Sequence, residues 1–474
     1  MSKRPAGRFV CQSCGAVWPK WSGRCEACGE WNTIVEEHAD IRSASARPAA
    51  GGATGRAAAR IGFVGLEGAA EPPPRIHTGI AELDRVLGGG LVPASVVLVG
   101  GDPGIGKSTL MLQAAAAMAS AGRRVLYISG EEAVDQLRLR ARRLGLTAPG
   151  LELAAAINVV DIAQTLEQEA DVSLVVIDSI QTMWLETIDS APGSVSQVRS
   201  SGFELIRLAK SRGFGLILVG HVTKEGSLAG PRVLEHMVDA VMYFEGDRGH
   251  QFRILRAAKN RYGATDEIGV FEMTDRGLAE VPNPSALFLA ERRGNIAGSA
   301  VFAGLEGTRP VLLEVQALLS PNAGSSPRRA VVGWESGRLN MLLAVLESRC
   351  GLRLSGMDVY LNIAGGLRVG EPAADLAVAA AIASALTGQP TSAGSVYFGE
   401  VGLSGEVRQV AQSEARLKEA QKLGFEHAFL PRRIARGRNR LVAPEGLRLE
   451  EIGHLSDLTA SFSTNPDGGA AEAV

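Results

Sequence analysis

Between residues 76 and 283, short apolar runs alternate with longer segments in which apolar residues recur at helical spacing. Runs rich in Val, Ile and Leu are typical of strands buried on both faces, and intervening helices are what a parallel sheet requires. The pattern predicts five strands, at Val96–Val99, Val125–Ile128, Leu174–Ile177, Leu216–Val219 and Ala240–Phe244. We therefore expect an α/β domain with a parallel sheet over residues 76–283.

The pattern changes on both sides of this region. Residues 1–35 contain paired cysteines and three tryptophans, whereas residues 36–75 are dominated by Ala, Gly, Arg and Pro, which predicts a flexible linker. Residues 284–455 show a second α/β pattern with Ala-rich helices. The Ser-, Gly- and Ala-rich residues 456–474 predict a disordered tail.

Composition narrows the class of protein. A chain of 474 residues suggests about three domains, and 46% apolar residues can build real cores. With 57 Gly and only 5% aromatic residues, the composition excludes a disordered chain, a collagen-like repeat and a disulfide-stapled domain. The 49 basic and 51 acidic residues nearly cancel, but a local basic groove can exist within a neutral total.

The setting that we expect is cytoplasmic and reducing, with no membrane partner. No apolar run follows the basic residues at the start of the sequence, so no signal peptide is predicted. The longest uncharged stretch, Leu376–Gly399, is interrupted by Gly388 and Pro390 and does not resemble a membrane span.

Two Cys-x-x-Cys-Gly turns lie close together in residues 1–35. Each turn places two thiolates side by side, and two turns complete a tetrahedral four-thiolate site, the closed geometry of structural zinc. Two disulfides or unrelated cysteines are the alternative. The predicted Zn²⁺ ligands are Cys11, Cys14, Cys25 and Cys28.

A phosphate-binding loop follows the first predicted strand. The sequence Gly-x-x-x-x-Gly-Lys-Ser lies between a predicted strand and a helix. In this motif the backbone amides of the loop bind the phosphates of ATP. Lys107 is predicted to contact the β- and γ-phosphates, and the Ser108 hydroxyl to bind Mg²⁺. The predicted cofactor-binding residues are Gly101, Asp102, Pro103, Gly104, Ile105, Gly106, Lys107, Ser108, Thr109 and Asp178.

Candidate catalytic residues follow other predicted strands. Asp178 ends an apolar strand at the position that holds Mg²⁺ through water. Glu131 is the predicted base that polarises the attacking water, with Glu132 as the alternative. Either acid can instead complement the dipole at a helix N-terminus. His221 follows another strand and is predicted to sense the γ-phosphate, although a lone His is more often structural.

Several segments together resemble the bacterial RadA (Sms) family of DNA repair proteins. They are Thr78–Gly90, the phosphate-binding loop, Ser129–Glu132 and Lys259–Gly263. The last of these is the most specific, and it carries Tyr262 where the family usually has Phe. The resemblance implies an α/β fold with a small N-terminal zinc-binding module, a RecA-like P-loop NTPase core and a C-terminal α/β Lon-protease-like domain.

The same resemblance implies a DNA-dependent ATPase of recombinational DNA repair. It predicts a DnaB-like ring, a hexamer, that promotes branch migration of strand-exchange intermediates on single-stranded and branched DNA together with RecA recombinase. Lys259 and Arg261 are then expected to enter the neighbouring subunit's nucleotide site. Loops 185–200 and 223–235 match where RecA-like folds hold DNA, and they carry Arg199, Lys224 and Arg232.

The Lon-like region lacks the residues that proteolysis needs. Ala373 stands where the family of Lon proteases has the nucleophilic Ser, and Arg416 stands at the position of the Lys base. A guanidinium stays protonated and cannot act as a base, so no protease activity is expected. Arg328, Arg329, Arg338 and Arg368 are candidates for a basic surface that contacts DNA, although each such charge taken alone is more often solvated or paired.

Two other functions are compatible with parts of the sequence. In the first, the chain is a nucleotide-gated DNA-binding scaffold without motor activity, and ATP only sets its conformation. In the second, it is a KaiC-like ATPase or kinase, in which similar phosphate-loop and Glu-Glu motifs occur. The zinc-binding module and the Lon-like region argue against the second function.

Overall fold

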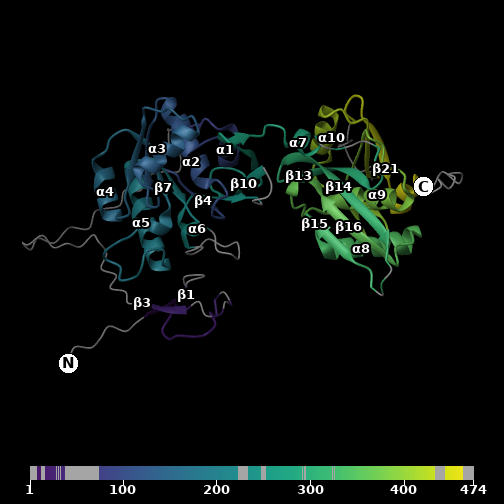
Figure 1. Ribbon diagram of the computed structural model, residues 1–474, viewed down its shortest axis with the longest axis horizontal. Coiled ribbons are helices and arrows are strands. Elements are labelled where there is room, and N and C mark those ends of the chain that lie inside the picture. The colour runs from purple at the N-terminus through teal and green to yellow at the C-terminus, as the bar shows by residue number, and fades with distance from the viewer. Residues whose placement is uncertain are drawn as a thin grey trace, which may run out of the picture. The chain divides into compact units, whose positions relative to one another are not determined.

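The structure is a computed structural model that describes residues 8–11, 16–27, 29, 31, 34–37, 74–221, 233–246, 252–290, 292, 295–322, 324, 326–432 and 443–462. The chain divides into two compact units, Met1–Glu280 and Val281–Val474. Figure 1 colours the first unit from purple to teal and the second from green to yellow. The boundary between the units falls just before the predicted one at residue 283.

The first unit begins with a small module, which we call the N-terminal module (residues 8–37). Its antiparallel sheet has the order β2 (Val17–Trp18), β1 (Arg8–Cys11), β3 (Ile34–Glu37). Cys11, Cys25 and Ile34 form its buried centre. The strand β3 continues past the predicted end of the module at residue 35 and into the predicted linker.

A nine-stranded sheet forms the rest of the first unit. Its order is β12 (Gly277–Glu280), β11 (Ile268–Thr274), β10 (Phe252–Asn260), β9 (Ala240–Glu245), β4 (Val96–Gly101), β8 (Gly215–Val219), β7 (Val172–Asp178), β5 (Arg124–Ser129), β6 (Leu151–Ala155). The strands from β9 to β6 are parallel, and β10, β11 and β12 extend the sheet in antiparallel fashion. All five predicted strands are present.

Helices cover both faces of this sheet. Alternate residues of β4 belong to two different cores, Val97 and Val99 to one and Val96 and Leu98 to the other. The helices are α1 (Ala81–Leu87), α2 (Lys107–Ser120), α3 (Val134–Arg143), α4 (Val159–Gln168), α5 (Val195–Arg212) and α6 (Val233–Met237), with a 3₁₀ turn, η1 (Ile180–Thr182). The layered α/β arrangement agrees with the fold predicted from the sequence.

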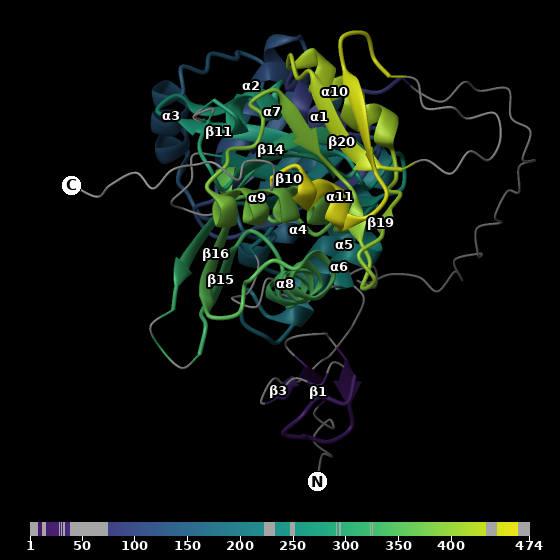
Figure 2. The same cartoon turned by 90° about the vertical axis from the view of Figure 1, so that its right-hand side faces the viewer.

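The second unit is built on a seven-stranded mixed sheet, seen with its helices in Figure 2. Its order is β15 (Arg329–Val332), β16 (Met357–Ile363), β14 (Arg309–Pro321), β13 (Ser299–Glu306), β17 (Ser395–Tyr397), β20 (His427–Pro431), β21 (Arg448–Ile452). The small strands β18 (Glu400–Val401) and β19 (Val407–Arg408) form a separate pair.

The Ala-rich helix α9 (Asp375–Thr387) is the centre of the second core, because its residues 375–384 are all buried. It packs on β13 and β14, and α8 (Ser336–Cys350) and α11 (Leu455–Ala460) pack beside it. The remaining helices are α7 (Pro284–Phe288) and α10 (Ser413–Lys422), with 3₁₀ turns η2 (Ala364–Gly366) and η3 (Pro372–Ala374).

The predicted tail begins too early. Leu455, Leu458 and Thr459 of α11 are buried, so the folded second unit extends to residue 462. Apolar residues recur at helical spacing there, but the Ser- and Thr-rich composition outweighs them in the prediction. Residues 463–474 lie outside the described residues. No helix among the described residues is long and apolar enough to cross a membrane.

Candidate nucleotide-binding and hydrolysis site

The loop between β4 and α2 has a backbone that requires glycine. Gly101 has φ +151°, and an added Cβ there would lie 2.6 Å from the carbonyl oxygen of Phe244. Gly106, at φ +116°, ends the loop as the N-cap of α2. These glycines hold the loop so that the helix N-terminus, with its free amides, opens onto it, which is the arrangement that binds phosphate.

Lys107 is 4% exposed, and its ammonium lies against the loop that it follows. Its Nζ donates to the carbonyl oxygens of Gly101, at 2.7 Å, and Asp102, at 2.9 Å. Burial lowers the pKa of Lys107 to about 8, although Asp178, Asp102 and Glu131 counteract part of the effect. Both of these acceptors are neutral carbonyl oxygens. A phosphate bound in the loop would supply the negative charge that they lack.

The strand ends bring the other candidate residues into one row. Ser129 at the end of β5 pairs with Asp178 at the end of β7, and Asp178 pairs with Val219 at the end of β8. Glu131 and His221 follow two of these strand ends. Ligands of open α/β sheets bind at this edge, beyond the carboxyl ends of the strands.

Asp178 is 5% exposed and is held by a neighbouring strand. The hydroxyl of Tyr127, in the middle of β5, donates to Asp178 Oδ2 at 2.6 Å. Burial raises the pKa of Tyr127 well above its usual range, and the Asp178 charge and hydrogen bond raise it further. The tyrosine therefore remains a donor and fixes the carboxylate that would hold Mg²⁺ with Ser108.

Glu131 is joined to two neighbouring residues through a single carboxylate oxygen. The Ser179 hydroxyl donates to Oε1, and His221 Nε2 lies 2.9 Å from the same atom. Partial burial works to raise the pKa of Glu131, but these two hydrogen bonds together with the charges of His221 and Lys107 outweigh it, and the pKa is lowered. Oε2 has no hydrogen bond among the described residues and can accept one from water.

Glu132 has a different role from its neighbour. Its carboxylate pairs with Arg140 on α3, and its backbone amide donates to the Ser129 hydroxyl at 2.9 Å. The ion pair holds Oε1 of Glu132 toward α3, whereas the carboxylate of Glu131 lies beside Ser179 and His221 at the strand ends. His221 Nδ1 is buried and has no hydrogen-bond partner in the part of the chain that the structure describes, as expected of a site that a ligand completes.

Lys259 and Arg261 lie at the end of β10, beyond a bulge between Ala257 and Lys259. The Lys259 ammonium caps the end of α6, donating to the carbonyl oxygens of Glu235 (2.6 Å) and Val238 (2.8 Å). Burial lowers its pKa, and the nearby Arg261 lowers it further.

Arg261 is held by Asp239, a residue that sequence reasoning missed. Arg261 Nη1 lies 3.2 Å from Asp239 Oδ1, while Asp239 Oδ2 accepts from Lys210 at 2.7 Å and from the amide of Val96 at 3.0 Å. The Asp239 carboxylate is 2% exposed and the Arg261 side chain 55% exposed. One buried acid thus connects the start of β4 with α5 and with the cation after β10.

Of the three cations predicted in the two DNA-holding loops, only Arg199 lies among the described residues. It is an exposed residue of α5 and not part of a loop, which corrects the prediction. The preceding loop is held by Gln197, a buried side chain that donates to the carbonyl oxygens of Leu185 (3.0 Å) and Ile188 (3.1 Å). Lys224 and Arg232 lie outside the described residues.

In the second unit, Arg416 is buried and bonded to its neighbours. It is 1% exposed and pairs with Glu371 at 2.6 Å. It also donates to the carbonyl oxygen of Ala303 at 2.7 Å, and its guanidinium lies 5.7 Å from the centre of the Phe398 ring. Ala373 is 2% exposed. The place of a Lys base is therefore filled by a buried, fully bonded cation.

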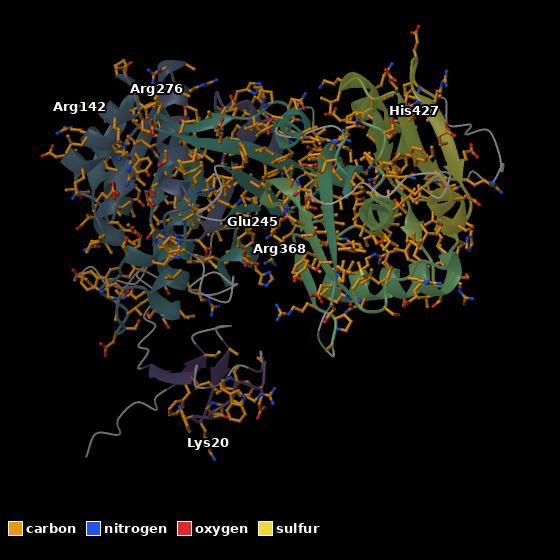
Figure 3. All side chains as sticks on the ribbon, turned by 45° about the vertical axis from the view of Figure 1, so that its right-hand side comes forward. Lys20, Arg142, Glu245, Arg276, Arg368 and His427 are labelled. Atoms are coloured by element: carbon orange, nitrogen blue, oxygen red, sulfur yellow. The ribbon has the colours of Figure 1, made fainter. Side chains whose placement is uncertain are left out.

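Arg338, a candidate for the basic surface, is a paired charge, the alternative that the sequence leaves open for each of these arginines. Arg338 forms two hydrogen bonds of 2.6 Å with the buried Asp375, so its charge is neutralised within the fold. Arg328 and Arg368 are exposed, and Figure 3 labels Arg368. Arg329 is half-buried, with Nη1 donating to the carbonyl oxygens of Arg328 and Met357.

The zinc ligands can be followed only in part. Cys11 and Cys25 are buried together, whereas Cys14 and Cys28 lie outside the described residues. For that reason no group of three potential metal ligands is found among the described residues. Two thiols buried at the centre of so small a module fit a structural metal site.

Comparison with family models gives three matches. The model described as AAA domain matches residues 72–227, the rubredoxin metal binding domain matches residues 9–36, and subunit ChlI of Mg-chelatase matches residues 340–434. The first two assign ATP with Mg²⁺ to the first unit and Zn²⁺ to the N-terminal module. A solved structure whose title describes an ATPase domain has a TM-score of 0.38 and 14% identity, covering 44% of this chain and 92% of that chain.

Full-length relatives are much more similar. DNA repair protein RadA of Brucella abortus (strain 2308) is 56% identical over 467 residues, which covers 97% of this chain and 98% of the relative. DNA repair protein RadA of Bacillus subtilis (strain 168) is 49% identical over 450 residues, covering 95% of this chain and 97% of the relative. With its P-loop ATPase site and N-terminal zinc ribbon, this chain belongs to the RadA family of DNA repair proteins.

Proposed function

We propose that the chain is a DNA-dependent ATPase that works as a hexameric ring, with RecA recombinase, to drive branch migration on single-stranded and branched DNA. The observation that carries the proposal is the row of Lys107, Asp178 and Glu131 at one edge of the sheet. A binding scaffold needs Lys107 and Asp178. Hydrolysis also needs a carboxylate such as Glu131, whose unbonded oxygen can accept a hydrogen bond from the attacking water.

Each residue of the row then has a distinct task. Bound ATP supplies the phosphoryl group and its Mg²⁺ neutralises the charge that develops on it. Lys107 and the N-terminus of α2 hold the phosphates, while Asp178, fixed by Tyr127, and Ser108 would hold the metal. Glu131 accepts a hydrogen bond from the attacking water through Oε2. His221, bonded to Oε1, links the state of the nucleotide to the strand end of β8.

We assign different tasks to the two cations of the Lys259–Gly263 segment. Each N–H of the Lys259 ammonium can be used on a carbonyl oxygen at the end of α6, so Lys259 is a positioning residue. Arg261 is more than half exposed and bonds Asp239 through one nitrogen, so its remaining N–H groups can reach a phosphate. Arg261 is therefore the proposed finger for the neighbouring subunit's site.

Mixing two inactive variants tests this arrangement. Arg261→Ala keeps an intact nucleotide site, and Lys107→Ala keeps an intact finger. If the finger acts between subunits, mixed rings contain Arg261→Ala sites served by Lys107→Ala neighbours, and ATP turnover rises above that of either variant alone. In the control mixture, Lys107→Ala is replaced by the double variant Lys107→Ala/Arg261→Ala, which cannot supply Arg261 to a neighbouring site. Equal turnover in the two mixtures would contradict action in trans.

A further inference from the structure

Two tryptophans of the N-terminal module are exposed to an unusual degree. Trp21 is 60% and Trp31 67% exposed, more than the other exposed aromatic residues in the described chain, Phe203 and Tyr262. Both indoles come close to Gly23: an added Cβ there would be 3.8 Å from Trp21 Cη2 and 3.9 Å from Trp31 Cζ3. The two rings therefore belong to one small region of the module surface.

Trp31 is fixed to the core of the module. It forms an antiparallel bridge with Arg24, whose guanidinium lies 5.8 Å from the centre of the indole ring. Arg24 Nε donates to the carbonyl oxygen of Gly29 at 2.8 Å, and the Gly29 amide donates to that of Cys25 at 2.7 Å. The backbone at Trp31 is thus tied to the turn that carries a predicted zinc ligand, and the Arg24 guanidinium lies beside its ring.

The surroundings of the two rings are cationic rather than aliphatic. Lys20 and Arg24 are exposed beside the tryptophans, and Figure 3 shows Lys20 extending outward from the module. Glu26 is also exposed. The aliphatic side chain of Ile34 is buried at the centre of the module. Flat aromatic faces next to cations complement a base and its phosphate, whereas a protein helix would need an aliphatic groove.

We propose that Trp21 and Trp31 form a stacking platform for the bases of single-stranded nucleic acid, with Lys20 and Arg24 facing its phosphates. The inference rests on the proposed DNA-dependent function and adds a second contact with DNA, on the N-terminal module. This contact reads the presence of unpaired bases. A duplex, whose bases are already stacked on each other, offers no face to the indoles.

The test compares two ligands on full-length, zinc-loaded protein by fluorescence anisotropy: a labelled oligo-dT and an abasic strand of the same length. Wild type should bind oligo-dT more tightly. Trp21→Ala should weaken oligo-dT binding about 5- to 150-fold, the range for loss of one stacked base, and leave abasic binding nearly unchanged. Trp21→Phe, which keeps a ring, should restore most of the affinity. The matched control is Phe203→Ala, which removes an exposed ring from the ATPase core.

Trp21 is chosen because it takes no part in the bridge or the cation–π contact of Trp31, so the module should keep its zinc. Measured zinc content checks this. Unchanged oligo-dT affinity in zinc-loaded Trp21→Ala would overturn the proposed stacking platform. It would do so even if the two tryptophans were found to bind a protein. A wild-type protein that binds no single-stranded DNA would overturn the proposed function as well, so the two failures are distinguishable.

Discussion

Adjacent residues with the same side chain take different roles because their neighbours differ. Glu131 is bonded by Ser179 and His221 and keeps one oxygen free among the described residues, whereas Glu132 is paired with Arg140. The sequence locates both acids at a strand end but cannot separate them. The difference depends on Arg140, a residue of α3 whose side chain meets Glu132 only in the fold.

We therefore predict that Glu131→Gln lowers ATP turnover by about 10²- to 10⁴-fold while nucleotide binding is kept, because the amide cannot accept a proton from water. Steady-state ATP hydrolysis and equilibrium nucleotide binding measure the two effects. Glu132→Gln is the matched control and should keep turnover within a few-fold of wild type. A larger loss in Glu132→Gln than in Glu131→Gln would show that the two roles are exchanged.

Tyr127→Phe tests how Asp178 is held. The change removes one buried hydroxyl that donates to a carboxylate, at 2.6 Å, and leaves the ring in place. We expect a loss of about 1.5–3 kcal/mol in unfolding free energy, the usual value of a hydrogen bond to a charged group, and a higher Mg²⁺ requirement for turnover. Urea unfolding and Mg²⁺ titration measure these. Unchanged values of both would mean that Asp178 does not depend on Tyr127.

At the scale of elements, the strands with continuous apolar runs could be predicted and the others could not. β4, β5, β7, β8 and β9 are buried in the middle of the sheet, so nearly every residue is apolar. β6 is an edge strand with exposed positions, and β10 alternates, with a bulge that breaks its period. The family resemblance predicts a DNA-holding loop at Arg199, but Ser194 caps α5 and the helix begins at Val195.

The contact between elements that we consider most important for coupling is Asp239. Asp239→Asn should keep an acceptor for the Val96 amide but lose the ion pairs with Lys210 and Arg261. We predict reduced turnover in the assembled ring with unchanged nucleotide affinity, because the finger loses its support while the phosphate loop does not.

Lys210→Met is the control for Asp239→Asn, because it removes one of the same ion pairs and leaves Arg261 in place. Turnover per ring and nucleotide Kd are compared for both variants. If Lys210→Met lowers turnover as much as Asp239→Asn, the acid acts through general stability and not through Arg261.

At the scale of the whole molecule, the second unit is packed around the buried helix α9. The sequence predicts no protease activity there, because Ala373 carries no nucleophile. The sequence could not reveal that the buried Arg416 pairs with Glu371, since that pairing joins residues far apart in the chain. The pair indicates that Arg416 serves the stability of the fold.

Arg416→Met should accordingly destabilise the second unit by about 3–5 kcal/mol, because it leaves the Glu371 charge without its partner. Thermal unfolding measures the loss. The double variant Arg416→Met/Glu371→Leu should recover much of it, since the uncompensated charge is removed. Casein incubated with the wild-type protein and ATP should remain intact. Cleavage of casein by the wild type that is lost in either variant would contradict the structural role of Arg416.

The central claim is that ATP hydrolysis is coupled to DNA. ATP turnover of the full-length protein, with and without single-stranded DNA, tests it most directly, with Lys107→Ala as the control for the site. We predict that DNA raises the turnover of wild type and that Lys107→Ala stays inactive under both conditions. Wild-type turnover that is the same with and without DNA would contradict the account and favour a nucleotide-gated scaffold.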